Sequence, residues 1–153
     1  MEILKSVNTL LDFAIEGEQR AYEFYTDLAK KCEYPALKSI LVEFALEEKG
    51  HKTHLLNIKE GKVAPLKFNE KVMDLGISDF LVDVDPESDP LDYQNILIIA
   101  MKKEKSSYKL YTMLSEMTDN LEVKELLLSI ANDEAKHKLR LEIEYDDVIL
   151  KQN

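Results

Sequence analysis

The chain has 153 residues, of which 45% are hydrophobic and 33% charged, and its formal net charge at pH 7 is -10. This length and composition favour one globular domain that spans residues 1–153. The acidic balance argues against nucleic acid or an anionic membrane as partner, because both are bound through clustered Lys and Arg. No signal-peptide core or membrane-length apolar run is found, which predicts a cytoplasmic protein, and Cys32 has no second cysteine for an intrachain disulfide.

The first predicted element is a helical hairpin at about residues 4–60. Its inward-facing positions, here called the seam, recur every three or four residues, which is the spacing of packed helices. The seam of the first helix is Val7, Leu11, Ala14, Glu18, Ala21, Tyr25 and Leu28, and that of the second is Leu37, Leu41, Phe44, Glu48, His51, Leu55 and Ile58. Because proline cannot continue a helix interior, we place the turn at Glu33-Tyr34-Pro35.

A long connection at residues 61–90 follows, and it contains Pro65, Gly76, Pro86 and Pro90. A link of this length is unusual inside a compact domain, but four-helix bundles of one class have a single long crossover. A helix of about 25 residues is about 38 Å long, and the link is long enough to span it. We therefore interpret residues 61–90 as a crossover between two hairpins.

The second hairpin, at about residues 91–150, repeats the first. When the sequence is shifted by 86 residues, positions 13–58 align with positions 99–144 without a gap, and 13 of the 46 pairs are identical. Asp119-Asn120 takes the place of the first turn. The third seam is Leu97, Ala100, Glu104, Ser107, Tyr111 and Leu114, and the fourth is Val123, Leu127, Ile130, Glu134, His137 and Leu141. The prediction is an all-α four-helix bundle made of two duplicated antiparallel helical hairpins.

Six seam positions carry ionisable side chains where a core would normally be apolar. They are Glu18, Glu48, His51, Glu104, Glu134 and His137. Burial of an unpaired carboxylate costs several kcal/mol, and no Lys or Arg occupies the seams to offset it. Two divalent metal ions would balance four carboxylates. In each hairpin, a Glu-x-x-His places two ligands on one side of a helix, since residues i and i+3 are neighbours.

The level of these residues in the bundle supports the same site. Residues at equal distance from an antiparallel turn lie opposite each other. The midpoint of Glu18 and Glu48 is position 33 and that of Glu104 and Glu134 is position 119, so both midpoints fall at the predicted turns. Each pair of glutamates is therefore predicted to lie at one level. The ligand types leave iron and manganese open, because both metals accept carboxylate and imidazole.

The pattern Glu18-x-x-Ala21-x-x-x-Tyr25 followed by Ala45-x-x-Glu48-x-x-His51, with its second copy from Glu104 to His137, resembles the rubrerythrin family of the ferritin-like superfamily. The resemblance implies a pair of iron ions, which manganese or zinc could replace. It implies that Glu48 and Glu134 bridge the two metals and that the other four ligands are terminal. Tyr25 and Tyr111 are expected to hydrogen-bond the ligand carboxylates, and Ser107 is expected to leave room beside the metals.

The function that the resemblance implies is reduction of hydrogen peroxide by an external electron donor, rubredoxin-like or other. Two alternatives remain open, namely oxidation of Fe(II) by O₂ and metal binding without turnover. A homodimer is expected. The sequence departs from the family in two features: it has no four-cysteine rubredoxin-like domain, and Ser107 stands where rubrerythrins have an additional carboxylate.

Overall fold

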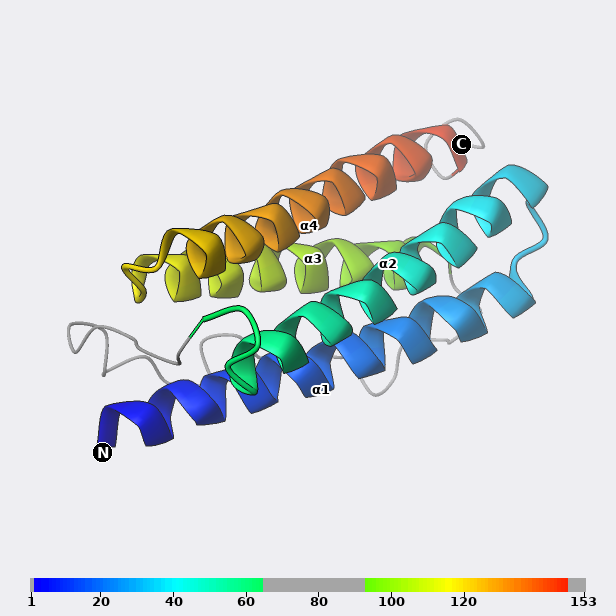
Figure 1. Ribbon diagram of the computed structural model, residues 1–153. Helices are drawn as coiled ribbons and strands as arrows, with labels where there is room; N and C mark the ends of the chain where they lie inside the picture. The colour runs from blue at the N-terminus through cyan, green and yellow to red at the C-terminus, as the bar shows by residue number, and fades with distance from the viewer. Residues whose placement is uncertain (1, 65–92, 149–153) are drawn as a thin grey trace. The chain divides into compact units, whose positions relative to one another are not determined.

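The computed structural model describes residues 2–64 and 93–148, and all regular secondary structure in these ranges is α-helical (Figure 1). The helices are α1 (Glu2–Lys31), α2 (Pro35–Lys59), α3 (Tyr93–Glu116) and α4 (Leu121–Val148). They confirm the all-α class and the four predicted helices of a bundle. Most of the predicted crossover, residues 61–90, lies outside the described residues. None of the described helices is long and apolar enough to cross a membrane.

The helices belong to two compact units. One unit contains α1, α2 and Glu116–Leu126, and the other contains the remaining parts of α3 and α4. In the first unit α1 and α2 are antiparallel neighbours (Figure 1). An ion pair between Lys59 and Asp12 joins them. In the second unit the amide of Gln94 on α3 donates a hydrogen bond of 3.0 Å to the hydroxyl of Tyr145 on α4.

The turn between α1 and α2 lies where the sequence predicts it. Tyr34 has an extended backbone (φ -97°, ψ 108°), and Pro35 is the first residue of α2, where its missing N–H removes no helical hydrogen bond. The Lys38 N–H donates to the Tyr34 carbonyl at 2.9 Å and starts the helical pattern. Cys32 is buried beside this turn, and its thiol donates to the same carbonyl at 3.5 Å.

Gly61 caps the C-terminus of α2. Its φ of 73° lies in the left-handed region that glycine adopts without steric cost. The Gly61 N–H donates to the Ile58 carbonyl at 3.1 Å, and the Lys62 N–H donates to the Asn57 carbonyl at 2.9 Å. This pair of hydrogen bonds satisfies carbonyls that the helix end would otherwise leave without donors.

The turn between α3 and α4 depends on a side-chain cap. The Asn120 side-chain oxygen accepts a hydrogen bond of 3.0 Å from the Val123 N–H, and the Thr118 hydroxyl accepts one of 3.2 Å from the Asn120 N–H. Thr118 and the adjacent Met117 are buried. The predicted break at Asp119-Asn120 is therefore the N-cap of α4.

We expect the substitution N120A to lower the free energy of unfolding by about 1 kcal/mol, because an uncapped helix N-terminus leaves its amide groups without acceptors. Urea denaturation of the metal-free protein measures this change. The variant N120D keeps an acceptor oxygen and should stay close to the wild type. An alanine variant as stable as N120D would contradict the capping role.

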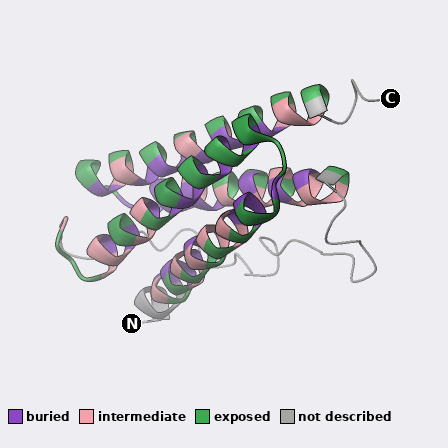
Figure 2. Cartoon of the chain, turned by 90° about the vertical axis from the view of Figure 1, so that its right-hand side faces the viewer, coloured by how far each residue is buried: buried purple, intermediate pink, exposed green. Residues whose placement is uncertain are grey.

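The buried residues form one stripe along each helix (Figure 2). Of the 26 predicted seam positions, 24 are buried. The remaining two, Ala21 and Ser107, are half-buried, and they are equivalent positions of the duplicated hairpins. The spacing of the seam residues therefore predicted the core correctly, including its ionisable members.

Candidate metal centre

The first hairpin brings together Glu18 of α1 with Glu48 and His51 of α2. The three side chains are 1–4% exposed. The Nδ1 atom of His51 lies 3.6 Å from Glu18 Oε2 and 3.4 Å from Glu48 Oε1. All three donors lie within 4.8 Å of one another, which is an arrangement that could hold a metal ion.

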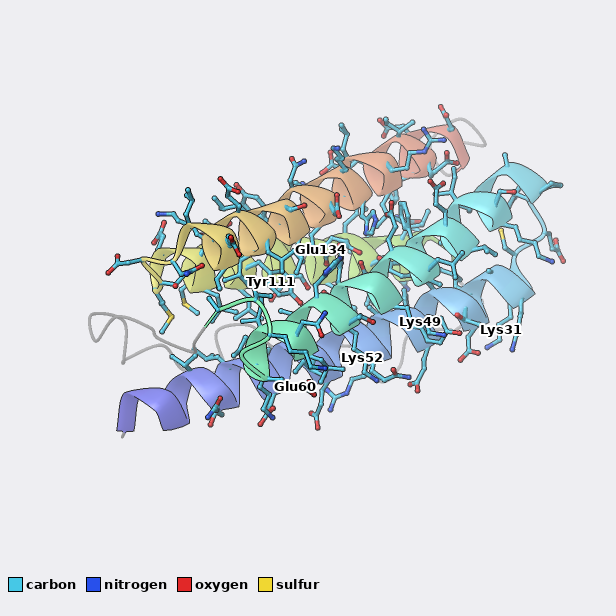
Figure 3. The ribbon with its side chains drawn as sticks, viewed as in Figure 1. Lys31, Lys49, Lys52, Glu60, Tyr111 and Glu134 are labelled. Atoms are coloured by element: carbon cyan, nitrogen blue, oxygen red, sulfur yellow. The ribbon has the colours of Figure 1, made fainter. Side chains whose placement is uncertain are left out.

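The second hairpin contains the equivalent arrangement, with Glu104 on α3 and with Glu134 and His137 on α4 (Glu134 is labelled in Figure 3). These side chains are 1–2% exposed. The Nδ1 atom of His137 lies 3.5 Å from Glu104 Oε1 and 3.8 Å from Glu134 Oε1. The duplication seen in the sequence is thus also a duplication of geometry, and each hairpin holds a complete triad.

The donor set and its spacing fit a divalent cation. Two ligands that each lie about 2.1 Å from one ion, at angles of about 90–110°, are about 3.0–3.4 Å apart. The measured separations of 3.4–3.8 Å are only slightly wider. Carboxylate oxygens with imidazole nitrogens are ligands that first-row divalent metals accept, whereas calcium and magnesium sites are built from oxygen.

The first triad concentrates negative charge in the core, and the pKa of its histidine reflects this. Burial lowers the pKa of His51, but the side chains of Glu18 and Glu48 raise it by a larger amount, so that the pKa is about 11. In the metal-free protein the imidazole therefore carries a proton at neutral pH, and this charge offsets part of the negative charge of two buried carboxylates. A metal ligated by Nδ1 must displace that proton.

The residues expected beside the ligands lie on the ligand side of their helices. Tyr25 and Tyr111 are 1% and 2% exposed, and each follows a ligand glutamate by seven residues, which keeps it on the same helix face (Tyr111 is labelled in Figure 3). The rings of Tyr25 and of Phe44 on α2 pack edge to face, with ring centroids 5.5 Å apart. Ser107 is half-buried, one turn after Glu104. The expected hydrogen bonds from the tyrosines to the carboxylates stay predictions.

One stabilising contact near the first triad was not predicted from the sequence. The Lys52 ammonium donates a hydrogen bond of 2.8 Å to the Gln19 side-chain oxygen, so that it joins α1 and α2 beside the ligands Glu18 and His51. The regular spacing of seam residues contains no signal for such contacts, because they form between side chains outside the seam. His54, one turn from His51, is exposed and does not belong to the triad.

Comparison with known proteins agrees with this geometry. Among curated proteins no match was found. A solved structure from Pyrococcus furiosus, described as hypothetical protein Pfu-1136390-001, is similar with a TM-score of 0.73 and 30% sequence identity, over 92% of this chain and 89% of that one. The sequence model of the Rubrerythrin family matches residues 9–145, which include both triads. The chain belongs to the Rubrerythrin family.

Proposed function

We propose that this chain is a diiron protein that reduces hydrogen peroxide to water with electrons from an external donor. The observation that carries the proposal is the pair of buried Glu₂His triads, one in each duplicated hairpin. Membership of the Rubrerythrin family supports a dinuclear iron site as the cofactor. The four positive charges of two Fe(II) ions would balance four glutamates. They would thereby offset the free-energy cost of burying carboxylates in a helical core.

Six residues would hold the two ions. By resemblance, Glu48 and Glu134 would bridge them, Glu18 and Glu104 would be terminal carboxylates, and His51 and His137 would each bind through Nδ1. When bound, the iron pair would supply the two electrons of the reaction H₂O₂ + 2 H⁺ + 2 e⁻ → 2 H₂O, one from each Fe(II). The chain's own contribution is a fixed donor set held in helices, with low exposure that keeps bulk water away from the ligands.

The tyrosines and Ser107 would act on the ligands rather than on the metals. Tyr25 and Tyr111 would orient ligand carboxylates through their hydroxyls, since a hydrogen bond to a ligand fixes its direction and basicity. The small side chains of Ser107 and of the buried Ala45 and Ala131 would leave space around the site. One cysteine cannot build a four-cysteine iron site, so a rubredoxin-type donor would have to be supplied from outside these 153 residues.

Anaerobic loading with Fe(II), followed by separate pulses of H₂O₂ and of O₂, tests the proposal. Stopped-flow absorbance measures the rate at which Fe(II) is oxidised. We expect peroxide to oxidise the loaded protein much faster than O₂ does. Faster oxidation by O₂ would favour a ferroxidase, and slow oxidation by both would favour metal binding without turnover.

Two histidine variants make a matched control for this experiment. H51A removes a proposed ligand, whereas H54A changes an exposed histidine on the same helix. H54A should load iron and react like the wild type, and H51A should not. Equal behaviour of the two variants would contradict the assignment of His51. The same experiments with Mn(II) show whether the site distinguishes the two metals, and sedimentation of the loaded protein tests the expected homodimer.

We expect His51 to bind its metal in both oxidation states of the protein. Ser107 stands where the family has a further carboxylate, and it offers no carboxylate oxygen to replace the histidine. His51 also lies at similar distances from its two glutamates as His137 does from Glu104 and Glu134. Crystal structures of the oxidised and reduced protein measure this directly. The prediction is wrong if His51 leaves the metal on oxidation or if an oxygen ligand replaces it.

A further inference from the structure

Three exposed lysines lie together on the outer side of α3. Lys102, Lys105 and Lys109 follow one another by three and four residues, which places them on one helix face. Glu104, a proposed metal ligand, is buried on the opposite side of the same helix turns. We call Lys102, Lys105 and Lys109 the lysine face. It is a concentrated positive charge in a chain of net charge -10.

Lys102, Lys105 and Lys109 gather three positive charges within about two turns of α3. Among the side chains that the structure describes, at residues 7–64 and 94–147, no ion pair joins any of the three to an acidic residue. Six other cationic side chains are engaged with an acidic, amide or aromatic group, namely Arg20, Lys49, Lys52, Lys59, Lys62 and Lys138. Within this described part of the chain, no acidic neighbour offsets the three charges of the lysine face.

The duplication shows that the lysine face is not inherited from the repeat. The equivalent positions on α1 are Glu16, Gln19 and Glu23, so the same helix face is acidic in the first hairpin and basic in the second. In the first hairpin Lys52 of α2 donates to Gln19. In the second, a lysine replaces that glutamine at position 105, and the equivalent Lys138 pairs with Glu142 within α4 instead.

From this arrangement we propose that the lysine face is the docking surface for the external electron donor, which is an acidic protein. The inference rests on the proposed peroxide reduction, because it names the partner of that reaction. Charge complementarity identifies the partner, since carboxylates on the donor would pair with the three clustered lysines. A donor seated on α3 would be separated from the ligand Glu104 by about one helix diameter, roughly 10–12 Å.

The face can act locally despite the negative net charge of the chain. At physiological salt the Debye length is about 8 Å, so acidic groups on distant helices contribute little to the potential there. A patch of one sign raises association rates with an oppositely charged protein about 10- to 1,000-fold, and the gain falls as salt is added. An acidic donor is therefore expected to bind here with strong dependence on ionic strength.

The test uses the full iron-loaded protein with reduced rubredoxin, a small acidic electron carrier, as the probe. In the variant K102E/K105E/K109E, we expect the KM for rubredoxin in peroxide reduction to rise at least about tenfold at low salt, with a smaller change in kcat. When salt is raised, the KM of the wild type for rubredoxin should rise toward that of the variant. The control variant K30E/K38E/K62E makes the same change of net charge at three other exposed lysines and should keep the wild-type KM.

A second readout separates this inference from the proposed function. Oxidation of the Fe(II)-loaded protein by peroxide needs no donor, and it should be equally fast in the wild type and in both variants. If that oxidation fails in the wild type, the proposed function fails. If it proceeds but the KM for rubredoxin is unchanged in K102E/K105E/K109E, or changes as much in the control, the docking surface is wrong. Sedimentation that shows the lysine variant alone losing self-association would assign the face to a second copy of the chain and overturn the inference.

Discussion

Replacement of Glu48 or of Glu134 by alanine is expected to remove most of both bound metal ions. In carboxylate-bridged helical bundles the bridging glutamates serve both ions, so the loss of one bridge weakens two sites together. Each of these residues is 1% exposed, so no other carboxylate can move in from solvent without disturbing the core. Metal analysis after gel filtration should give about two ions per chain in the wild type and well under one in E48A and E134A.

Glu47 offers a matched control for this experiment. It is the exposed neighbour of Glu48 on α2, and the variant E47A removes the same group without touching the triad. We expect E47A to bind as much metal as the wild type. Retention of two ions per chain by both E48A and E134A would refute the bridging assignment, even if the ions are held more weakly.

Removal of the metal is expected to lower the melting temperature substantially at neutral pH. A ligand that binds only the folded state stabilises it by about 2.7–4.1 kcal/mol when its free concentration is 100 to 1,000 times the Kd. For a protein of this size that corresponds to roughly 5–15 °C. The physical reason is that the buried glutamates of each triad lose their counter-charge, although the proton on His51 retains part of it. Calorimetry of chelated and Fe(II)-loaded samples under anaerobic conditions measures the difference.

The variants distinguish a specific site from general binding of metal to an acidic protein. The double variant E48A/E134A should show little or no shift when iron is added, whereas H54A should show the full shift. A chelated wild type that melts no lower than the loaded sample would count against a metal site at these residues. A shift of equal size in E48A/E134A would instead place the stabilising ion elsewhere on the chain.

The sequence by itself determined the four helices, the two turns and the composition of the triads. Apolar residues at steps of three and four lie on one face of a helix, so this spacing predicts helices that bury that face. Pro35 and Asn120 mark helix N-termini because proline fits the first turn of a helix and asparagine caps it. Glu18 and Glu48 are equally far from the first turn. They were therefore expected to lie opposite each other, as such residues do in any antiparallel hairpin. Local rules and one geometric argument were sufficient for these features.

Only the tertiary structure decided which partners the surface charges engage. The sequence contains Lys52 and Lys138 without indicating that the first donates to Gln19 on another helix and the second pairs with Glu142 on its own. It also does not specify that each histidine presents Nδ1, rather than Nε2, to its two glutamates. These choices depend on side-chain rotamers and, for Lys52–Gln19 and His137–Glu104, on contacts between residues 33 positions apart, and seam spacing carries no information about either.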